Sequence, residues 1–490
     1  MRILIILLLN LCLWNELSLA QTALDSILDA RPYAWWGAMV TDLQSEDTLY
    51  MRNADLSFMP ASVTKLYTTS AALDQLGPDY KYVTHFYSDG LQTGRILDGN
   101  LIIKGAGDPS TGAPGPEWMN IFNAISDSLI AQGIYEIRGD IIGDDNVFDD
   151  VPLGSDWSWE DLTFGYAPQI NGLTFHDAIV EIEARPTRLG QRAELTIIPQ
   201  IPDYLTIDNQ TLTIASGQSL VEGHTRIPES NQITVSSQVP LGRSDPEELT
   251  VHNPTLYFLH ALNHILKSKD IHVNGQLLDI DDLPDDYIYS TDRLIGSHTS
   301  LPISELIATV NKDSHNLYAE HLLKTLGYEH PDLDEDDEIG SASMGVSASM
   351  RTYAKAGINT DRIQLVDGSG LSRKNLVSPA MTIRLLHFMA SHPDHHVREA
   401  FISSLAIGGQ DGTLEHQFIG NSPAHGKVRA KTGTLGNVSS LAGYITRDDG
   451  THLAFVIFCN HFQGRHSAIR AIQESFVNSL VTYHITEKSN

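Results

Sequence analysis

The sequence predicts an α+β fold in which one domain is split along the chain by a long β-rich insert. Strand patterns occur near both ends of the chain, and helical patterns dominate from about residue 300 until the last strands. Short alternating runs bounded by Gly, Pro, Asp and Asn fill 81–294 instead. Because early and late strands can complete one sheet, we expect 21–80 and 295–490 to form one domain and 81–294 to form one or two smaller, nested domains.

The first predicted elements are strands at 35–43 and 49–53 and a helix at 62–76. Pro60 disfavours a helix that continues from the preceding residues, so Ser62 should lie at or near the helix N-terminus. Within the insert we expect strands at 82–87, 101–104, 193–198, 205–208, 232–239 and 271–277, and helices at 117–132 and 254–267. Beyond it we expect helices at 303–311, 317–326, 343–356, 379–391 and 464–484, and strands at 440–446 and 452–460 around the hairpin signal at 448–450.

The first twenty residues have the pattern of a cleaved secretory signal. Arg2 is a short basic start, residues 3–14 are almost wholly apolar, and Ser18-Leu19-Ala20 offers the small residues that a signal peptidase prefers. A membrane anchor is the alternative, but the apolar run is shorter than the ~20 residues that a span needs. We therefore expect cleavage after Ala20 and an exported protein with no membrane span after cleavage.

The cysteine content and the net charge limit the cell compartment and the classes of partner that we expect. Cys12 leaves with the signal, and Cys459 remains as a lone thiol in an apolar run, where a buried, inert thiol is expected. An exported protein without disulfides fits a bacterial envelope, so we expect the periplasm. The formal net charge of −29 argues against nucleic-acid partners and anionic membranes. The acidic stretch 332–338 lacks the Gly and Glu that a calcium loop requires, so we expect a solvated loop there.

Ser62-Val63-Thr64-Lys65 combines a nucleophile and a base at the start of the first helix. Positions i and i+3 share a helix face, so the Lys65 amine can reach the Ser62 hydroxyl. Serine is a poor nucleophile until a base takes its proton, and lysine becomes a base when burial or a nearby cation lowers its pKa. An N-cap serine beside a surface lysine would produce the same pattern, so the motif alone is weak.

Two further motifs add polar groups. In Ser314-His315-Asn316, between two helical runs, the serine can relay protons and the Asn amide can hold a carbonyl, although a helix cap is the alternative. In Lys431-Thr432-Gly433 the lysine supplies positive potential, Thr432 and Thr434 can bind a carboxylate, and Gly433 lets a substrate backbone approach. The alternative for this last motif is an edge strand that carries a protective lysine.

Together the three motifs supply the nucleophile, the base and the carboxylate-binding groups that a serine acyl-transfer enzyme needs. They occur in the same order as in penicillin-binding proteins and β-lactamases. A Ser-His-Asp triad is the competing mechanism, but the chain contains no Gly-x-Ser-x-Gly elbow, and we expect His315 to be packed or exposed rather than catalytic. Ser314 follows Ser62 by 252 residues (314 − 62 = 252), which is long enough to hold whole extra domains.

The chain resembles the D-alanyl-D-alanine carboxypeptidase/endopeptidases, which are low-mass class C penicillin-binding proteins. The resemblance covers nearly the whole mature chain, and the long insert between the first two motifs is a hallmark of that family, whereas in class A β-lactamases these motifs lie close together. The matching segments are 60–66, 104–109, 139–145, 253–254, 311–320, 367–372 and 431–435. The resemblance implies a β-lactamase/transpeptidase-like domain, with an antiparallel sheet flanked by helices.

The resemblance also implies catalytic roles. Ser62 would attack the carbonyl between two D-alanines of a stem peptide, with Lys65 as the base. Ser314 and Lys431 would carry protons toward the leaving D-alanine, and water would then cleave the acyl-enzyme. Asp367 is expected to order a loop near the site.

The substrate-binding residues implied in the same way are Asn316, Lys431, Thr432, Gly433 and Thr434. Backbone N–H groups, of Ser62 and Thr434, would hold the oxyanion. The expected partners are peptidoglycan peptides, with β-lactams as covalent inhibitors, and no cofactor or metal is implied. Two alternatives remain: a β-lactamase or esterase on a similar core, and a catalytically silent wall-binding protein.

Overall fold

The computed structural model describes residues 21–284, 286–330 and 339–482, and these residues form two compact units. The first unit lies within Met1–Asp79, Ile303–Leu326 and Val346–Asn490, and the second within Tyr80–Pro302 and Gly327–Gly345. The predicted signal at 1–20 and the predicted acidic loop at 332–338 lie outside the described residues. The nested division of 81–294 into two domains stays a prediction.

A six-stranded antiparallel sheet forms the centre of the first unit, in the order β2-β1-β23-β22-β21-β20. Its strands are β1 (Trp35–Asp42), β2 (Thr48–Arg52), β20 (Ala406–Ile407), β21 (Val428–Leu435), β22 (Val438–Thr446) and β23 (His452–Asn460). The first strand pairs along its whole length with the last, from Trp35 opposite Asn460 to Asp42 opposite Leu453. Early and late segments of the chain therefore complete one sheet, as the sequence predicts.

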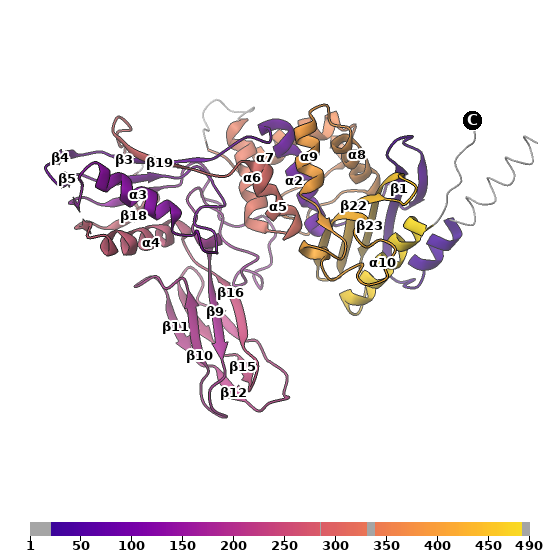
Figure 1. The fold of residues 1–490 in the computed structure, drawn as a ribbon, viewed down its shortest axis with the longest axis horizontal. Helices are drawn as coiled ribbons and strands as arrows, with labels where there is room; N and C mark the ends of the chain where they lie inside the picture. The colour runs from indigo at the N-terminus through magenta and orange to yellow at the C-terminus, as the bar shows by residue number, and fades with distance from the viewer. Residues whose placement is uncertain (1–20, 285, 331–338, 483–490) are drawn as a thin grey trace, which may run out of the picture. The chain divides into compact units, whose positions relative to one another are not determined.

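Helices cover both faces of this sheet (Figure 1). Residues 21–28 of the first unit are helical. The other described helices of this unit are α2 (Thr64–Leu76), α5 (Ile303–Lys312), α6 (Asn316–Glu329), α7 (Ala342–Lys355), α8 (Pro379–Ala390), α9 (His395–Ser403) and α10 (His466–Thr482). The last residues of α6 and the first residues of α7 belong to the second unit. Helix α10 packs against β22, and α8 packs against β1 and β23. Strands β22 and β23 are buried at all but one residue each, because apolar side chains on both faces meet helices. This is the α+β class that the sequence predicts.

The second unit is rich in short strands. Its sheets have the orders β18-β8-β6-β3-β19, β17-β7-β5-β4, β10-β9-β16, β11-β14-β13 and β12-β15. The strands are β3 (Val83–Ser88), β4 (Leu91–Thr93), β5 (Ile96–Asp98), β6 (Leu101–Lys104), β7 (Glu136–Ile137), β8 (Ile141–Asp144), β9 (Ile179–Arg185), β10 (Glu194–Ile198), β11 (Thr206–Asn209), β12 (Leu212–Ile214), β13 (His224–Arg226), β14 (Gln232–Val235), β15 (Gln238–Pro240), β16 (Asp245–Thr250), β17 (His272–Val273), β18 (Leu277–Asp279) and β19 (Leu294–Thr299).

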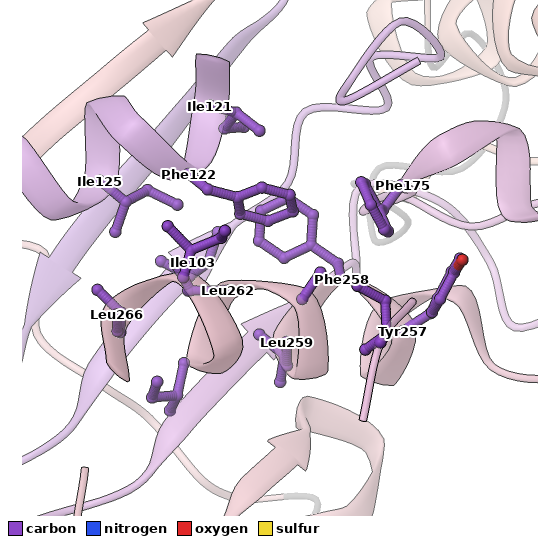
Figure 2. Close-up of a cluster of buried hydrophobic side chains, with 14 of the residues drawn as sticks. Ile103, Ile121, Phe122, Ile125, Phe175, Tyr257, Phe258, Leu259, Leu262 and Leu266 are labelled. Carbon is purple, nitrogen blue, oxygen red and sulfur yellow. The ribbon is translucent and has the colours of Figure 1, made fainter. Parts of the chain in front are cut away.

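Two helices of the second unit, α3 (Asn120–Ala131) and α4 (Pro254–Ser268), pack against each other over these strands. Phe122 on α3 and Phe258 on α4 meet in the middle of the apolar core, with ring centroids 4.9 Å apart (Figure 2). Asn253 caps α4 by accepting the Leu256 N–H through its side chain, and Pro254 follows at the first helical position. The predicted helices at 117–132 and 254–267 are thus present.

Several strands of the second unit differ from those that the sequence predicts. The predicted strand at 232–239 is two strands, β14 and β15, and the one at 271–277 is divided between β17 and β18. Strand β16 has the sequence DPEELT, whose residues have low strand propensity, and it forms because β9 pairs with it over six residues. Tertiary pairing outweighs local preference there.

Two further predictions can be compared with the structure. Cys459 is buried in β23, and burial raises the pKa of its thiol to about 12, in agreement with an inert thiol. Among the described parts of the chain, no helix combines the length and the apolarity that crossing a membrane requires.

Candidate active site

Ser62 lies in a short 3₁₀ turn, Ala61–Val63, that leads directly into α2. The predicted helix therefore begins two residues later than expected, at Thr64, and Ser62 precedes its first α-helical turn. The Ser62 side chain is half-buried, whereas Lys65, one turn further on, is completely buried. The 3₁₀ turn leaves the nucleophile accessible while the helix carries the lysine into the core.

The Lys65 amine contacts three oxygen atoms. Its Nζ lies 3.1 Å from Ser62 Oγ, 2.5 Å from Asn316 Oδ1 and 2.7 Å from the Ser369 carbonyl oxygen. A protonated amine can donate to all three atoms. A neutral amine can donate to the amide and carbonyl oxygens and accept the Ser62 hydroxyl proton with its lone pair. The geometry therefore suits removal of that proton.

Burial lowers the pKa of Lys65 to about 7, although the negative charges of Glu320 and Asp367 oppose this shift. An ordinary lysine is almost wholly protonated at neutral pH, whereas a group with a pKa near 7 is divided between its two forms. Lys65 can therefore accept a proton at neutral pH and also return it.

Lys431 lies at the other side of the site, on β21. Its Nζ donates to Ser314 Oγ at 2.8 Å and to the Thr432 carbonyl at 2.9 Å. Burial, and next the positive charge of Lys65, lower its pKa well below the usual lysine range. Ser314 occupies the turn between α5 and α6 with a φ of +65°, a left-handed conformation uncommon for serine. The structure thus brings the second and third motifs into direct contact.

Gly433 lies against the turn that carries Ser62. A Cβ atom there would lie 2.6 Å from the Pro60 carbonyl oxygen and 3.0 Å from the Ser62 nitrogen. The missing side chain therefore lets β21 pack against the turn that carries Ser62. The expectation that Gly433 lets a substrate backbone approach stays a prediction.

The remaining predicted residues surround this arrangement. Thr432 Oγ1 donates to Thr413 Oγ1 at 2.8 Å, and Thr434 is exposed at the end of β21. The ring of His315 packs on Tyr318 with centroids 4.5 Å apart. That His315 is not catalytic stays a prediction.

Asp367 and Glu320 hold the loop that presents the Ser369 carbonyl to Lys65. Asp367 accepts the Gly370 N–H at 2.8 Å and the Ser372 N–H at 2.7 Å, which orders the loop as expected. Glu320 accepts the Gly368 and Ser369 N–H groups. Glu320 was not among the predicted site residues. Its signal is the spacing of four residues after Asn316, which places both side chains on one face of α6.

Comparison with known proteins places this fold and site in a family. A profile of the D-Ala-D-Ala carboxypeptidase 3 (S13) family matches residues 20–481. A D-alanyl-D-alanine carboxypeptidase of Actinomadura sp. strain R39 is 30% identical over 474 residues, covering 94% of this chain and 84% of the relative. The D-alanyl-D-alanine carboxypeptidase DacB of Haemophilus influenzae is 27% identical, covering 87% of this chain and 85% of the relative.

A solved structure has the same fold. The crystal structure of penicillin binding protein 4 from Haemophilus influenzae matches with a TM-score of 0.79 at 23% identity, covering 94% of this chain and 99% of that protein. These findings confirm the family resemblance and the fold class predicted from the three motifs and the insert. The chain belongs to the D-Ala-D-Ala carboxypeptidase 3 (S13) family, a family of serine peptidases.

Proposed function

We propose that this chain cleaves the bond after the first of two D-alanines in peptidoglycan stem peptides, through an acyl-enzyme on Ser62. The observation that carries the proposal is the 3.1 Å contact between Ser62 Oγ and the buried Lys65 Nζ. A nucleophile beside a base with a pKa near 7 is what acyl transfer by serine requires. Family membership supports the same substrate class.

In the first step, Lys65 Nζ takes the Ser62 proton while Oγ bonds to the substrate carbonyl carbon. The carbonyl oxygen becomes an oxyanion, for which we propose the backbone N–H groups of Ser62 and Thr434 as donors. The close packing of Gly433 on the Ser62 turn supports this role, because it brings the two backbones together. Asn316 holds Lys65 through its amide oxygen, and its amide nitrogen can donate to a substrate carbonyl.

In the second step, the C–N bond breaks and the leaving D-alanine takes a proton. Ser314 is the proposed donor, with Lys431 restoring its proton, because their side chains lie 2.8 Å apart. Lys431, Thr432 and Thr434 are proposed to bind the terminal carboxylate. The proton that Lys65 took from Ser62 replaces the one that Lys431 gave up, so Lys65 is neutral again. Water then attacks the ester, Lys65 accepts one proton of the water and passes it to the ester oxygen, and this oxygen returns to Ser62 as a hydroxyl.

The same chemistry extends to two further substrate classes. A cross-link between stem peptides contains the same type of D-alanyl bond, which supports endopeptidase activity. β-Lactams mimic the D-Ala-D-Ala end and should acylate Ser62. A relative from Dictyostelium discoideum, 27% identical, is called a penicillin-sensitive carboxypeptidase. We place the mature protein in the periplasm, where peptidoglycan is found, on the basis of the predicted signal at 1–20.

The experiment that tests this function is penicillin labelling followed by peptide mass spectrometry. The acyl group should be found on Ser62, and the same protein should release D-alanine from a pentapeptide. An acyl group on any other residue would overturn the assignment. Steady turnover of nitrocefin, instead of a single burst, would favour a β-lactamase or esterase.

A further inference from the structure

Glu320 is a buried carboxylate that is linked to Lys65 through the backbone of one residue, Ser369. Its side chain is 1% exposed. Its Oε1 accepts the Ser369 N–H at 2.8 Å and its Oε2 accepts the Gly368 N–H at 3.0 Å. The carbonyl of the same Ser369 accepts from Lys65 Nζ at 2.7 Å. The position of this carbonyl therefore depends on the Glu320 carboxylate.

Charge adds a second connection. Burial favours the neutral form of Lys65, whereas the negative charges of Glu320 and Asp367 favour its protonated form. Burial, and next the negative charge of Asp367, raise the pKa of Glu320 itself to about 7, so Glu320 gains its charge in the same pH range in which Lys65 titrates. Lys431 faces the site from β21, and Lys324, one turn beyond Glu320 on α6, is also buried. Burial and the two carboxylates therefore act on the proton affinity of Lys65 in opposite directions.

We propose that Glu320 is a positioning residue for the acyl-transfer reaction, which fixes the Ser369 carbonyl against Lys65 and adjusts the proton affinity of that amine. The inference rests on the proposed roles of Ser62 and Lys65. A merely structural anchor of the 367–372 loop would change the rate but leave the pH dependence in place.

The test is Glu320→Gln, which keeps the shape and removes the charge. Without that charge Lys65 binds its proton less tightly, so the acidic limb of kcat/KM should move to lower pH. The lost backbone acceptor should slow penicillin acylation at neutral pH about tenfold. Glu320→Asp keeps the charge, so its acidic limb of kcat/KM should coincide with that of wild type. Glu305→Gln, an exposed change on α5, should leave both the acidic limb and the acylation rate as in wild type.

Two results would overturn the inference: an acidic limb in Glu320→Gln that coincides with that of wild type, or an equal shift in Glu320→Asp. Its failure is distinguishable from failure of the proposed function. If Ser62→Ala remained fully active, the mechanism itself would be wrong. If Ser62→Ala were inactive and the acidic limb of kcat/KM in Glu320→Gln coincided with that of wild type, only the role of Glu320 would be wrong.

A separate observation on α9 concerns metal binding. His395, His396 and Glu399 are exposed on one side of this helix, and each offers a ligand atom within 4.8 Å of the others. Val397 and Phe401 lie on the opposite, buried side. Glu399 is four residues after His395 and three after His396, so it shares a helix face with each histidine and the three side chains can reach one ion.

The cluster borders a hollow of about 460 Å³ in the first unit. Its lining residues are Pro78, Asp79, Ser304, His396, Glu399, Ala400 and Ser403. Ser304 N–H donates to the Pro78 carbonyl at 3.1 Å, so the end of the α2 segment and the start of α5 meet there. Asp79 brings a further carboxylate to the same hollow.

We propose that His395, His396 and Glu399 form a zinc site outside the catalytic centre. Two imidazoles and one carboxylate are a common donor set for Zn²⁺, with water in the fourth position. The positive helix N-terminus opposes a cation, but the Asp394 carboxylate lies at the N-cap, where it accepts the His396 N–H at 2.8 Å. The net charge of −29 also favours cations.

The test is calorimetric titration of Zn²⁺ into the mature, untagged, chelator-treated protein. We expect one site per chain, with affinity reduced about tenfold or more in His396→Ala and in Glu399→Gln. His452→Ala, an exposed histidine on β23, should bind as wild type. Zinc affinity that is the same in His396→Ala, Glu399→Gln and wild type, or no binding by the wild type, would overturn the site.

Discussion

Two clusters of ionisable side chains, one buried in the first unit and one partly buried in the second, differ in the signs of their charges. The first unit buries two basic groups, Lys65 and Lys431, together with the carboxyl group of Glu320. The second unit brings together three carboxyl groups, those of Asp145, Asp279 and Asp281, whose nearest oxygen atoms lie within 4.8 Å of one another. The first cluster is mixed in sign, and the second is wholly acidic.

The same physical cause shifts the pKa values of the two clusters in opposite directions. Burial lowers the pKa of Lys65 to about 7. Burial and the charge of Asp279 raise the pKa of Asp145 to about 7, and burial raises that of Asp279 to about 6. Both clusters therefore titrate near neutral pH. The comparison teaches that a shifted pKa alone does not mark an active site; the nucleophile beside the shifted group does.

The largest expected effect tests which of the two clusters is catalytic. Ser62→Ala removes the nucleophile, so D-alanine release should fall by about 10⁴-fold or more, while the melting temperature stays near that of wild type. Ser45→Ala, an exposed serine of the same unit, is the matched control. Release that persists in Ser62→Ala would mean that the mixed-sign cluster is not the catalytic one.

A second prediction tests how tightly the active-site elements are packed. Gly433→Ala places a Cβ atom 2.6 Å from the Pro60 carbonyl oxygen, so β21 and the Ser62 turn must separate. A displacement of this kind should reduce the rate constant of penicillin acylation about 10²-fold. In Gly436→Ala the new atom would meet only the flexible end of Arg373, and acylation should be near wild type. Equal rates in the two variants would contradict this account.

Gly433 also illustrates what could be read from the sequence. The motif predicted its importance, because Lys-Thr-Gly signals a strand beside the nucleophile, but its contact with the Ser62 turn depends on the pairing of β21 with β22 and could not be predicted. Glu320 was missed for a similar reason. A glutamate on a helix looks like a surface residue until the 367–372 loop, distant in the sequence, covers it.

The strands of the two units also differ in how well the local sequence predicts them. The strands at 35–43 and 452–460 have strong apolar patterns, and the sequence predicted both them and their union in one sheet. The polar strand β16 has no such pattern and is defined only by its pairing with β9, so local sequence could not identify it.

The third prediction concerns the pH dependence of the mixed-sign cluster. As the pH falls through the pKa of Lys65, which burial lowers to about 7, the amine takes up a proton and can no longer accept that of Ser62. The rate constant of penicillin acylation should then fall about tenfold for each pH unit. A rate constant that stays level through this range would mean that Lys65 is not the base, or that its pKa lies lower.

The smallest expected effect tests the acidic cluster. A carboxyl whose pKa is raised in the folded protein binds more protons folded than unfolded, so its stabilising contribution is complete below its unfolded pKa and is lost as the pH rises through about 6 to 7. Asp145→Asn removes one of the repelling charges and keeps an oxygen that can accept from Thr255. The free energy of unfolding should therefore rise by about 1 kcal/mol at pH 8 and change little at pH 5.

Denaturant unfolding of Asp145→Asn and wild type at the two pH values measures this difference. Asp208→Asn, on β11 of the same unit, removes one exposed charge outside the cluster and should not reproduce the pH-dependent gain. Acylation by penicillin should be unchanged in Asp145→Asn, because the variant leaves Ser62 and Lys65 intact. A loss of stability at pH 8 would mean that the carboxylates of this cluster are not in repulsion but are held together by a bound cation, since removing one ligand would then cost more than the relieved charge supplies.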